Sequence, residues 1–293
     1  MHQNTRKLIN LTKRLDHMER NEIINLLQVK DKEQEELFSR ARFMRKEHFG
    51  NKAIVRGAIE VTDICRVDCD YCPMRKSNKN DRYLMNSDEI VEASKLVRDA
   101  GLKVVFLQGG EVPITTKIVG EAIPRIRDLF HNDVEILLCL GNKTREEYRF
   151  LKQQGADSYI LKHETSNSEL HYKMRHVTLD SRLECLRDLL DLGYKVGTGT
   201  IVGLPGQNLD HLADDIMLFN SFSKPTISAL LKSSSAAVAL SACFSILSTT
   251  TKGRLKFPRD LIEISSLDPL NSSIVFCIKV ALSPMAMLPI KVL

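Results

Sequence analysis

The sequence predicts an α/β fold with alternating strand and helix units, a partial or full TIM-type (β/α) barrel. Two observations support this class. From residue 54 to residue 222, apolar runs of strand length alternate with amphipathic stretches of helical length. The helical stretch over residues 86–101 also has clear end signals, with Asn86 or Ser87 as the cap and Gly101 as the stop. Repeated units of this kind form parallel sheets with right-handed crossovers, so we expect chemistry at the carboxyl ends of the strands.

The individual elements follow in chain order. The expected strands cover residues 53–62, 103–110, 134–140, 157–164 and 194–203. The expected helices cover residues 86–101, 120–130, 144–156, 179–193 and 208–222. Residues 120–130 contain a proline, and we expect that helix to begin just before it.

Three regions differ in pattern. Residues 1–50 predict two or three amphipathic helices that cap the main domain. Residues 51–223 form the predicted α/β core. Residues 224–293 are rich in serine, threonine and alanine and show neither clear alternation nor caps. The rest of a barrel is not recognisable there, and we hypothesise a truncation or an altered reading frame.

Composition limits the classes of partner. The chain is 43% hydrophobic and 27% charged, with a formal net charge of +5. That charge is small for 293 residues and the basic residues are mixed with acidic ones, so we expect no nucleic-acid partner. The sequence after Met1 has no apolar leader, and the apolar run at residues 236–247 is too short to cross a bilayer. We therefore expect a cytoplasmic protein with no membrane partner and with reduced thiols.

Three of the seven cysteines lie within eight positions, at Cys65, Cys69 and Cys72. Thiolates are soft ligands that suit iron–sulfur clusters and zinc. The C-x3-C-x2-C spacing supplies three ligands, which would leave one iron of a cubane cluster open to a substrate or cofactor. A zinc site completed by a distant histidine, or three incidental cysteines, are the alternatives. The position of the loop after the first strand favours a catalytic cluster.

Polar and small residues follow the later strands. Gly109 and Gly110 allow close approach of a ligand to the backbone, and Glu111 adds a carboxylate beside them. Glu164 follows the fourth strand and can accept hydrogen bonds, whereas its neighbour His163 is more typical of a packed residue. Arg182 is a charge on an otherwise apolar helix. The small residues of the fifth strand end suit a flat ligand; they are Gly199, Ile201 and Gly203.

Together these motifs resemble the radical S-adenosylmethionine (radical SAM) superfamily. The resemblance rests on "EVTDICRVDCDYCPMR", "VVFLQGGEVP", "LKHETSNSELHYKMR" and "LGYKVGTGTIVGLPGQNLDHLADDI", and it covers roughly residues 20–220. It implies a radical SAM barrel that uses a 4Fe-4S cluster and S-adenosylmethionine, which is cleaved to a 5′-deoxyadenosyl radical. Within the superfamily, the stretches look most like the iron–iron hydrogenase maturases, in a group with biotin synthase and methylornithine synthase.

The resemblance also implies residue roles. Cys65, Cys69 and Cys72 would ligate the cluster and so count as both metal-binding and catalytic. The other motif positions would contact S-adenosylmethionine. Its methionine amino group would be bound by Gly109, Gly110 and Glu111, and its ribose and methionine carboxylate by Glu164 and Arg182. Its adenine would lie near Tyr71, Gly199, Ile201 and Gly203. The implied partners are a small-molecule substrate, a flavodoxin or ferredoxin as electron donor, and other hydrogenase maturases.

The chain departs from the family pattern at three places. It has "GGEVP" where the family reads closer to "SGEDP", and His176 follows Arg175 where the family has proline. The alignment of Arg182 needs a one-residue gap after "KMR". The substrate-contacting strands expected after residue 224 are not recognisable. Biotin-synthase-like or methylornithine-synthase-like chemistry, and a non-catalytic cluster-binding remnant, are therefore the alternative functions.

Overall fold

The structure is a computed structural model, which describes residues 18–51, 54–222, 255–256, 263–264 and 277–280. Six strands form one sheet in the order β5-β4-β3-β2-β1-β8, and every neighbouring pair is parallel. These strands are β1 (Arg56–Thr62), β2 (Val104–Gly109), β3 (Glu135–Cys139), β4 (Ser158–Ile160), β5 (Lys195–Gly197) and β8 (Cys277–Val280). The first five lie side by side in chain order, as in a (β/α) barrel, which confirms the predicted class.

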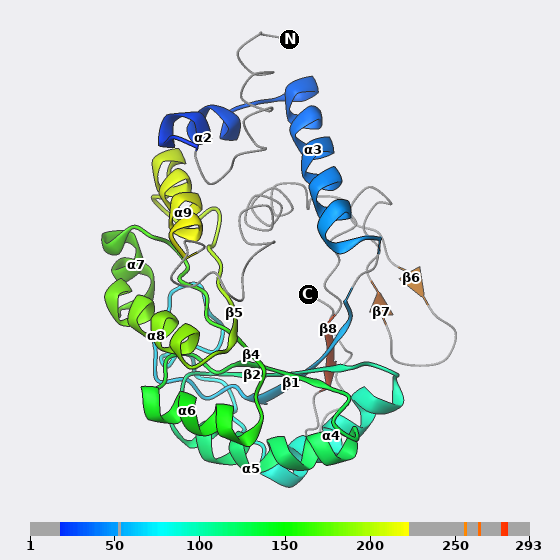
Figure 1. Cartoon of the computed structure of the whole chain (residues 1–293). Coiled ribbons are helices and arrows are strands. Elements are labelled where there is room, and N and C mark those ends of the chain that lie inside the picture. Colours follow the sequence, from blue (N-terminus) through cyan, green and yellow to red (C-terminus); the bar gives the residue numbers. More distant parts are fainter. Residues whose placement is uncertain (1–17, 52–53, 223–254, 257–262, 265–276, 281–293) are drawn as a thin grey trace.

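Helices follow the strands and cover one face of the sheet (Figure 1). They are α4 (Ser87–Asp99), α5 (Ile114–Leu129), α6 (Arg145–Gln154) and α8 (Leu179–Asp191). Asn86 and Thr144 each close a capping box with a glutamate three residues later, which satisfies backbone N–H groups that the first turn leaves free. Gly155 ends α6 in the left-handed region at φ 111°.

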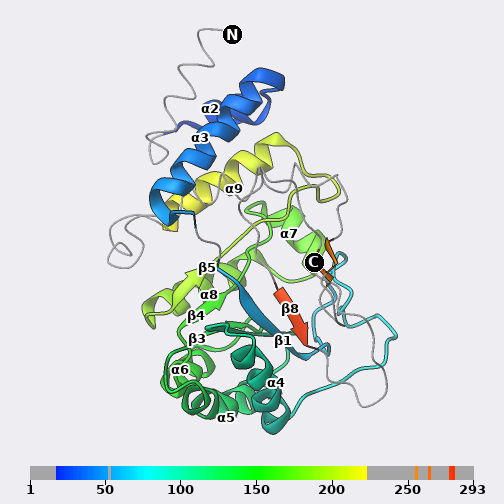
Figure 2. The same cartoon turned by 90° about the vertical axis from the view of Figure 1, so that its right-hand side faces the viewer.

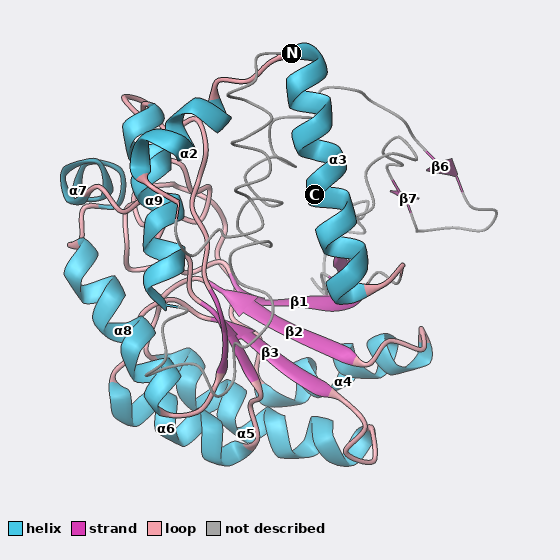
Figure 3. Cartoon of the chain, turned by 45° about the horizontal axis from the view of Figure 1, so that its top comes forward, coloured by secondary structure: helices cyan, strands magenta, loops and turns pink. Residues whose placement is uncertain are grey.

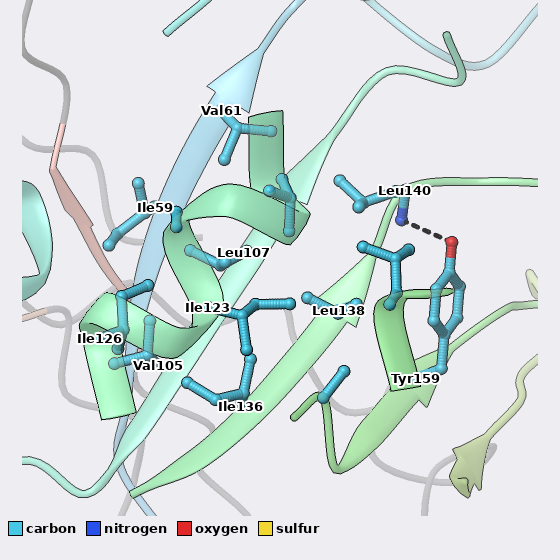
Figure 4. Close-up of a cluster of buried hydrophobic side chains, with 14 of the residues drawn as sticks. Ile59, Val61, Val105, Leu107, Ile123, Ile126, Ile136, Leu138, Leu140 and Tyr159 are labelled. Atoms are coloured by element: carbon cyan, nitrogen blue, oxygen red, sulfur yellow. Dashed lines mark hydrogen bonds between the residues drawn. The ribbon is translucent and has the colours of Figure 1, made fainter. Parts of the chain in front are cut away.

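The main core lies between the sheet and these helices (Figure 4). Alternate residues of the strands point into it, among them Ile59, Leu107 and Ile136, all fully buried. Each such side chain contributes roughly 1.5–3 kcal/mol through burial. Figure 4 also shows the Tyr159 hydroxyl, which accepts from the Leu140 N–H at 3.3 Å. The opposite face of the sheet carries Ala58, Val104, Phe106 and Leu137.

The amino-terminal helices form a separate apolar cluster with the last helix of the core (Figure 2). They are α2 (Arg20–Leu27), which packs on α9 (Leu209–Phe222), and α3 (Asp31–Phe49), whose Leu37 belongs to the same apolar cluster. Ile23 and Leu26 of α2 are buried against Ala213 and Ile216 of α9. The predicted amino-terminal helices are therefore confirmed for the described residues, and residues 1–17 lie outside them.

Most predicted elements are found at their predicted places, but three differ in their bounds and one helix was not predicted (Figure 3). Helix α5 begins at Ile114, so the expectation that it starts just before Pro124 is wrong; the helix accommodates that proline in its interior. Strands β4 and β5 are three residues each, shorter than predicted. Helix α7 (Ser168–Arg175) was not predicted, because eight residues are too few to show a helical period.

The predicted tail, residues 224–293, lies almost wholly outside the described residues. The exceptions are β8 and the two-residue strands β6 (Leu255–Lys256) and β7 (Glu263–Ile264), which pair antiparallel with each other. Strand β8 flanks β1 on the side opposite β2. In the part of the chain that the structure describes, no helix has the length and apolar character needed to cross a membrane.

Candidate active site at the carboxyl ends of the strands

The predicted site residues gather where the parallel strands end. Cys65 to Cys72 follow β1, and Gly109 to Glu111 follow β2. Glu164 lies beyond β4, and Gly199 to Gly203 lie beyond β5. This is the edge at which barrel folds place catalytic groups.

The cysteine loop is a compact turn fixed by its own backbone. The Cys72 N–H donates to the Cys69 carbonyl at 3.0 Å, and the Lys76 N–H donates to the Val67 carbonyl at 3.0 Å. Cys69 is buried, whereas Cys65 and Cys72 are partly exposed. The turn therefore presents three thiols from one short segment.

Arg82 fastens both ends of this loop. Its guanidinium donates to the carbonyls of Asp63 at 2.5 Å, Met74 at 3.3 Å, and Arg75 and Asn78 at 2.8 Å each. A guanidinium has five N–H donors in a rigid plane, so one side chain can serve four acceptors. The loop entry at residue 63 and its exit at residues 74–78 are held by this one cation.

Two backbone N–H groups point at the sulfur of Cys65. They belong to Val67 and Glu111 and lie 3.5 and 3.3 Å from Cys65 Sγ. Burial raises the pKa of the Cys69 thiol, and the Arg175 cation opposes that rise. For Cys69 to bind a metal as a thiolate, positive charge must lie next to its sulfur, and the metal itself supplies that charge.

Gly110 lets the end of β2 lie directly against the cysteine loop. A Cβ on Gly110 would meet the Ile64 carbonyl oxygen at 2.0 Å and Cys65 Cβ at 2.9 Å. A Cβ on Gly109 would meet Val61 Cγ2 at 3.0 Å. The Gly110 N–H also donates to the Thr62 carbonyl at 3.2 Å. The two glycines are thus required by close packing.

Four buried charges lie beside this contact. Glu111, Glu164, Arg175 and Arg182 are between 3% and 7% exposed. Glu111 Oε2 is 3.6 Å from Arg175 Nη2 and 3.7 Å from Arg182 Nη2, while Arg175 Nη1 is 3.9 Å from Glu164 Oε1. At these distances the opposite charges balance one another, but the groups are too far apart to form hydrogen bonds. Burial raises the pKa of Glu164, and Lys162, Arg182 and Arg175 oppose that rise.

Several polar atoms of this cluster have no hydrogen-bond partner among the described residues. They are Glu164 Oε2, Arg175 Nε and Arg182 Nε. Unpaired buried polar atoms are costly, because they lose water without gaining a protein partner. The cluster is therefore suited to a ligand that carries both positive and negative groups.

Tyr71 and Ile201 lie together on the apolar side of the site. Both pack against Leu170, Met174 and Leu204. The Tyr71 hydroxyl is 3.5 Å from Arg175 Nη1, and burial raises its pKa, so it is neutral at physiological pH. A flat apolar ligand would find an aromatic ring and aliphatic groups here.

The backbone around Glu164 is held in an unusual conformation. Glu164 has a left-handed φ of 68°, which is uncommon for residues other than glycine. Its N–H donates to the Gly199 carbonyl at 3.0 Å, and its carbonyl accepts from the Ile201 N–H at 2.8 Å. Gly203 has φ 92°, and its N–H donates to Gln207 Oε1 at 2.6 Å. The fourth and fifth strand ends thus form one unit.

His163 is a packed residue, as its sequence context suggested. It is fully buried, with Nδ1 3.0 Å from Thr198 Oγ1 and its ring edge-to-face with Phe219. Burial lowers its pKa to about 4, so it is neutral at physiological pH.

Sequence reasoning missed four residues beside Glu111, one of which is Arg66, whose guanidinium donates to Glu111 Oε1 at 3.3 Å. Arg175 lies at the end of α7, the helix that was not predicted. The Asn142 N–H donates to Glu111 Oε2 at 2.8 Å, and a Cβ on Gly141 would meet that oxygen at 2.4 Å. The one sequence feature that could have indicated this region is Gly141, which directly follows the predicted third strand at the edge where barrel folds place catalytic groups.

The residues present fit an iron–sulfur cluster and a zwitterionic nucleotide. Three thiols with N–H donors near sulfur are the ligand type of such clusters. In the described segments, no three His, Cys, Asp or Glu side chains are arranged to hold a single metal ion. The unpaired atoms of Glu164, Arg175 and Arg182 match a ligand with amino, carboxylate and hydroxyl groups.

Comparison with known proteins agrees with this geometry. The radical SAM superfamily pattern matches residues 59–219. The chain is 41% identical to the [FeFe] hydrogenase maturase subunit HydE of Thermotoga maritima over 186 residues, which are 62% of this chain and 53% of that protein.

Two solved structures share the fold. The crystal structure of HydG, a maturase of the [FeFe]-hydrogenase, has a TM-score of 0.68 at 23% identity and covers 76% of this chain and 52% of its own. That of methylornithine synthase (PylB) has a TM-score of 0.66 at 22% identity, with 82% and 76% covered. The chain spans about half the length of the curated relatives it matches.

Proposed function

Because the chain belongs to the radical SAM superfamily, we propose that it binds a 4Fe-4S cluster and S-adenosylmethionine and cleaves the latter reductively. Cys65, Cys69 and Cys72 would hold the cluster. Once bound, such a cluster supplies the electron that splits the sulfonium S–C5′ bond into methionine and a 5′-deoxyadenosyl radical. The observation that carries the proposal is the contact between the cysteine loop and the end of β2, where the Glu111 N–H lies 3.3 Å from Cys65 Sγ.

The buried charges would orient the methionine moiety. Glu111 is held by Arg66, which donates to Oε1 at 3.3 Å, and by the Asn142 N–H, which donates to Oε2 at 2.8 Å. Each carboxylate oxygen can accept a second hydrogen bond, so Glu111 and the backbone of Gly109 and Gly110 can receive an ammonium group. Arg182 would take the carboxylate with its unpaired Nε. Arg175 lies 3.6 Å from Glu111 and 3.9 Å from Glu164 and would balance the negative charge of both side chains.

The apolar side would hold the nucleoside. Glu164, with Oε2 unpaired, would accept from ribose hydroxyls. Tyr71 and Ile201 would contact the adenine, and Gly199 and Gly203 would admit its edge to the main chain. A Cβ on Gly199 would lie 3.3 Å from Lys162 Cγ, so a larger residue would crowd the backbone at which the adenine is expected.

The physiological reaction would be a step in building the active-site cluster of iron–iron hydrogenase. Support comes from the 41% identity to HydE. A flavodoxin or ferredoxin would supply the electron, other maturases would be partners, and the protein would act in the cytoplasm. A methylornithine-synthase-like reaction is the second candidate, favoured by the shared fold with PylB over 82% of this chain. A cofactor-binding protein without turnover is the third, because only half of each curated relative is matched.

The test is anaerobic reconstitution of residues 1–293 with iron and sulfide, followed by dithionite and S-adenosylmethionine. We expect about four irons per chain, the content of one cubane cluster, and release of 5′-deoxyadenosine measured by chromatography. The triple variant C65A/C69A/C72A is the matched control and should show neither. Zinc in place of iron, or no metal, would contradict the proposal. A loaded cluster that binds S-adenosylmethionine without product would support the third candidate.

A further inference from the structure

We infer that Asp215 on α9 is a positioning residue that holds the nucleotide-facing backbone of residues 164–166 and 200 in place. The inference rests on the proposed function. Asp215 lies within the stretch of residues 192–216 that carries the family resemblance, but the resemblance gives it no role. It touches neither the cysteine loop nor the four buried charges through a described hydrogen bond. It is nevertheless fully buried.

The Asp215 carboxylate collects donors from two strand ends. Oδ1 accepts from the Ser166 N–H at 2.5 Å and lies 3.3 Å from the Thr165 hydroxyl. Oδ2 lies 2.7 Å from the Thr200 hydroxyl. Among the described residues, no lysine or arginine forms an ion pair with it within 4 Å. Its hydrogen bonds thus come from backbone and hydroxyl groups, which fix position.

The groups that Asp215 holds flank Glu164. The Thr200 hydroxyl is also 2.7 Å from the Glu164 carbonyl, and Ser166 is two residues beyond Glu164. Glu164 adopts its left-handed conformation only with support, because a non-glycine residue is disfavoured there. The carboxylate therefore connects two segments beside Glu164: it accepts from the Ser166 N–H, and it contacts the Thr200 hydroxyl that lies next to the Glu164 carbonyl.

Helix α9 is itself anchored on its other side. Arg20 of α2 donates to Asp214 at 2.6 Å and to Asp210 at 2.7 Å. Ala213 and Ile216 are buried in a cluster with Ile23 and Leu26 of α2. The helix thus links the amino-terminal helices to the nucleotide-facing loops, with Asp215 on the site side.

Asparagine can replace this carboxylate without loss of a partner. Its Oδ1 can accept from Ser166 and Thr165, and its Nδ2 can donate to Thr200 Oγ1. Thr200 has one hydroxyl proton, which would then serve the Glu164 carbonyl. Leucine has a similar volume but no polar atom, so it leaves those donors unpaired. The pair D215N and D215L therefore separates positioning from packing.

The first readout is backbone amide hydrogen exchange of the metal-free protein, resolved to the peptides that contain residues 163–167 and 198–202. We expect faster exchange at both in D215L, wild-type exchange in D215N, and no change at residues 56–62 in either. I216A is the matched control, because it removes a buried side chain of α9 on the face toward α2. Equal exchange in D215L and wild type would overturn the inference.

The second readout is S-adenosylmethionine affinity of the reconstituted protein. We expect D215L to weaken it about tenfold at unchanged iron content, and D215N to restore it, since a lost buried hydrogen bond to a charged group costs about that factor. An equal loss in D215L and I216A would show general destabilisation and overturn the inference. If wild-type protein binds no S-adenosylmethionine, the proposed function fails, while the exchange readout still decides the role of Asp215.

Discussion

The cysteine loop and the nucleotide-facing wall are built in different ways. Most hydrogen bonds that shape the loop come from residues 63–82, and Arg82 donates to carbonyls at both its entry and its exit. Backbone contacts to Glu111 and Met174 join the loop to the rest of the site. The wall, formed by residues 163–166, 175 and 198–203, depends on α7, α9 and the ends of two strands. The contrast teaches that cluster loading and cofactor affinity should fail independently.

The largest effect is expected at Arg82. R82A removes four hydrogen bonds to loop carbonyls and should cost about 3 kcal/mol of unfolding free energy. Most of the iron should be lost after reconstitution, as measured by iron content per chain. R98A removes an exposed arginine of α4 and serves as the control. Full iron content in R82A would contradict local support of the loop.

Acid should weaken the wall before the loop. Burial lowers the pKa values of His163 and His171 from 6.5 to about 4. The unfolded chain therefore binds protons between pH 6.5 and pH 4 that the folded chain does not, so stability present above pH 6.5 is lost as pH falls through that window. Each histidine contributes at most roughly 3 kcal/mol.

Chemical denaturation across pH 4 to 7 measures this loss. H163N and H171N should each flatten the profile relative to the unsubstituted protein. His131 lies outside this wall, so H131N is a suitable control and should leave the slope unchanged. A profile that stays equally steep in both wall variants would contradict the assignment.

A smaller effect is expected at Gly141, where two causes can be separated. Gly141 and Gly193 have nearly equal φ values, 72° and 75°, but only Gly141 would bring a Cβ against Glu111. G193A should cost about 1 kcal/mol for the left-handed backbone alone. G141A should cost more and should weaken S-adenosylmethionine binding at normal iron content, measured by calorimetric titration. Equal behaviour of the two variants would remove Gly141 from the site.

The smallest effect is expected at Arg20, which reaches the wall only through α9. Its ion pairs with Asp210 and Asp214 are partly exposed, and such pairs add little stability. R20A should slightly lower the melting temperature and leave iron content unchanged. An effect on S-adenosylmethionine affinity as large as that of D215L would show that α9 transmits strain more strongly than its contacts indicate.

The predictable parts of this molecule are those encoded by neighbouring residues. Spacing alone selected Cys65, Cys69 and Cys72, and Asn86 and Thr144 marked helix starts that the structure confirms. Capping and periodicity act within a few positions, so a single sequence contains them. The strand-end positions of Glu111 and Glu164 and the apolar context of Arg182 selected these three residues, and the family resemblance supplied their expected roles. The structure brings them together.

The unpredicted parts are those assembled from distant segments. Arg175 meets Glu111 and Glu164 only because a short helix turns back toward the cysteine loop. Asp215 reaches Ser166 and Thr200 because α9 lies between α2 and the loops that follow β4 and β5. Neither contact leaves a local pattern in the sequence. The start of α5 was misplaced because its first residues are β-branched and offer no side-chain cap.

The end of α7 explains why this chain can have histidine where the family pattern has proline. His176 has φ 58°, a conformation that proline, locked near −65°, cannot adopt. Its N–H donates to the Tyr172 carbonyl at 2.8 Å, and its Nε2 lies 3.0 Å from Asp70 Oδ1 in the cysteine loop. A proline at this position would therefore remove both contacts and force the turn after α7 into another backbone conformation.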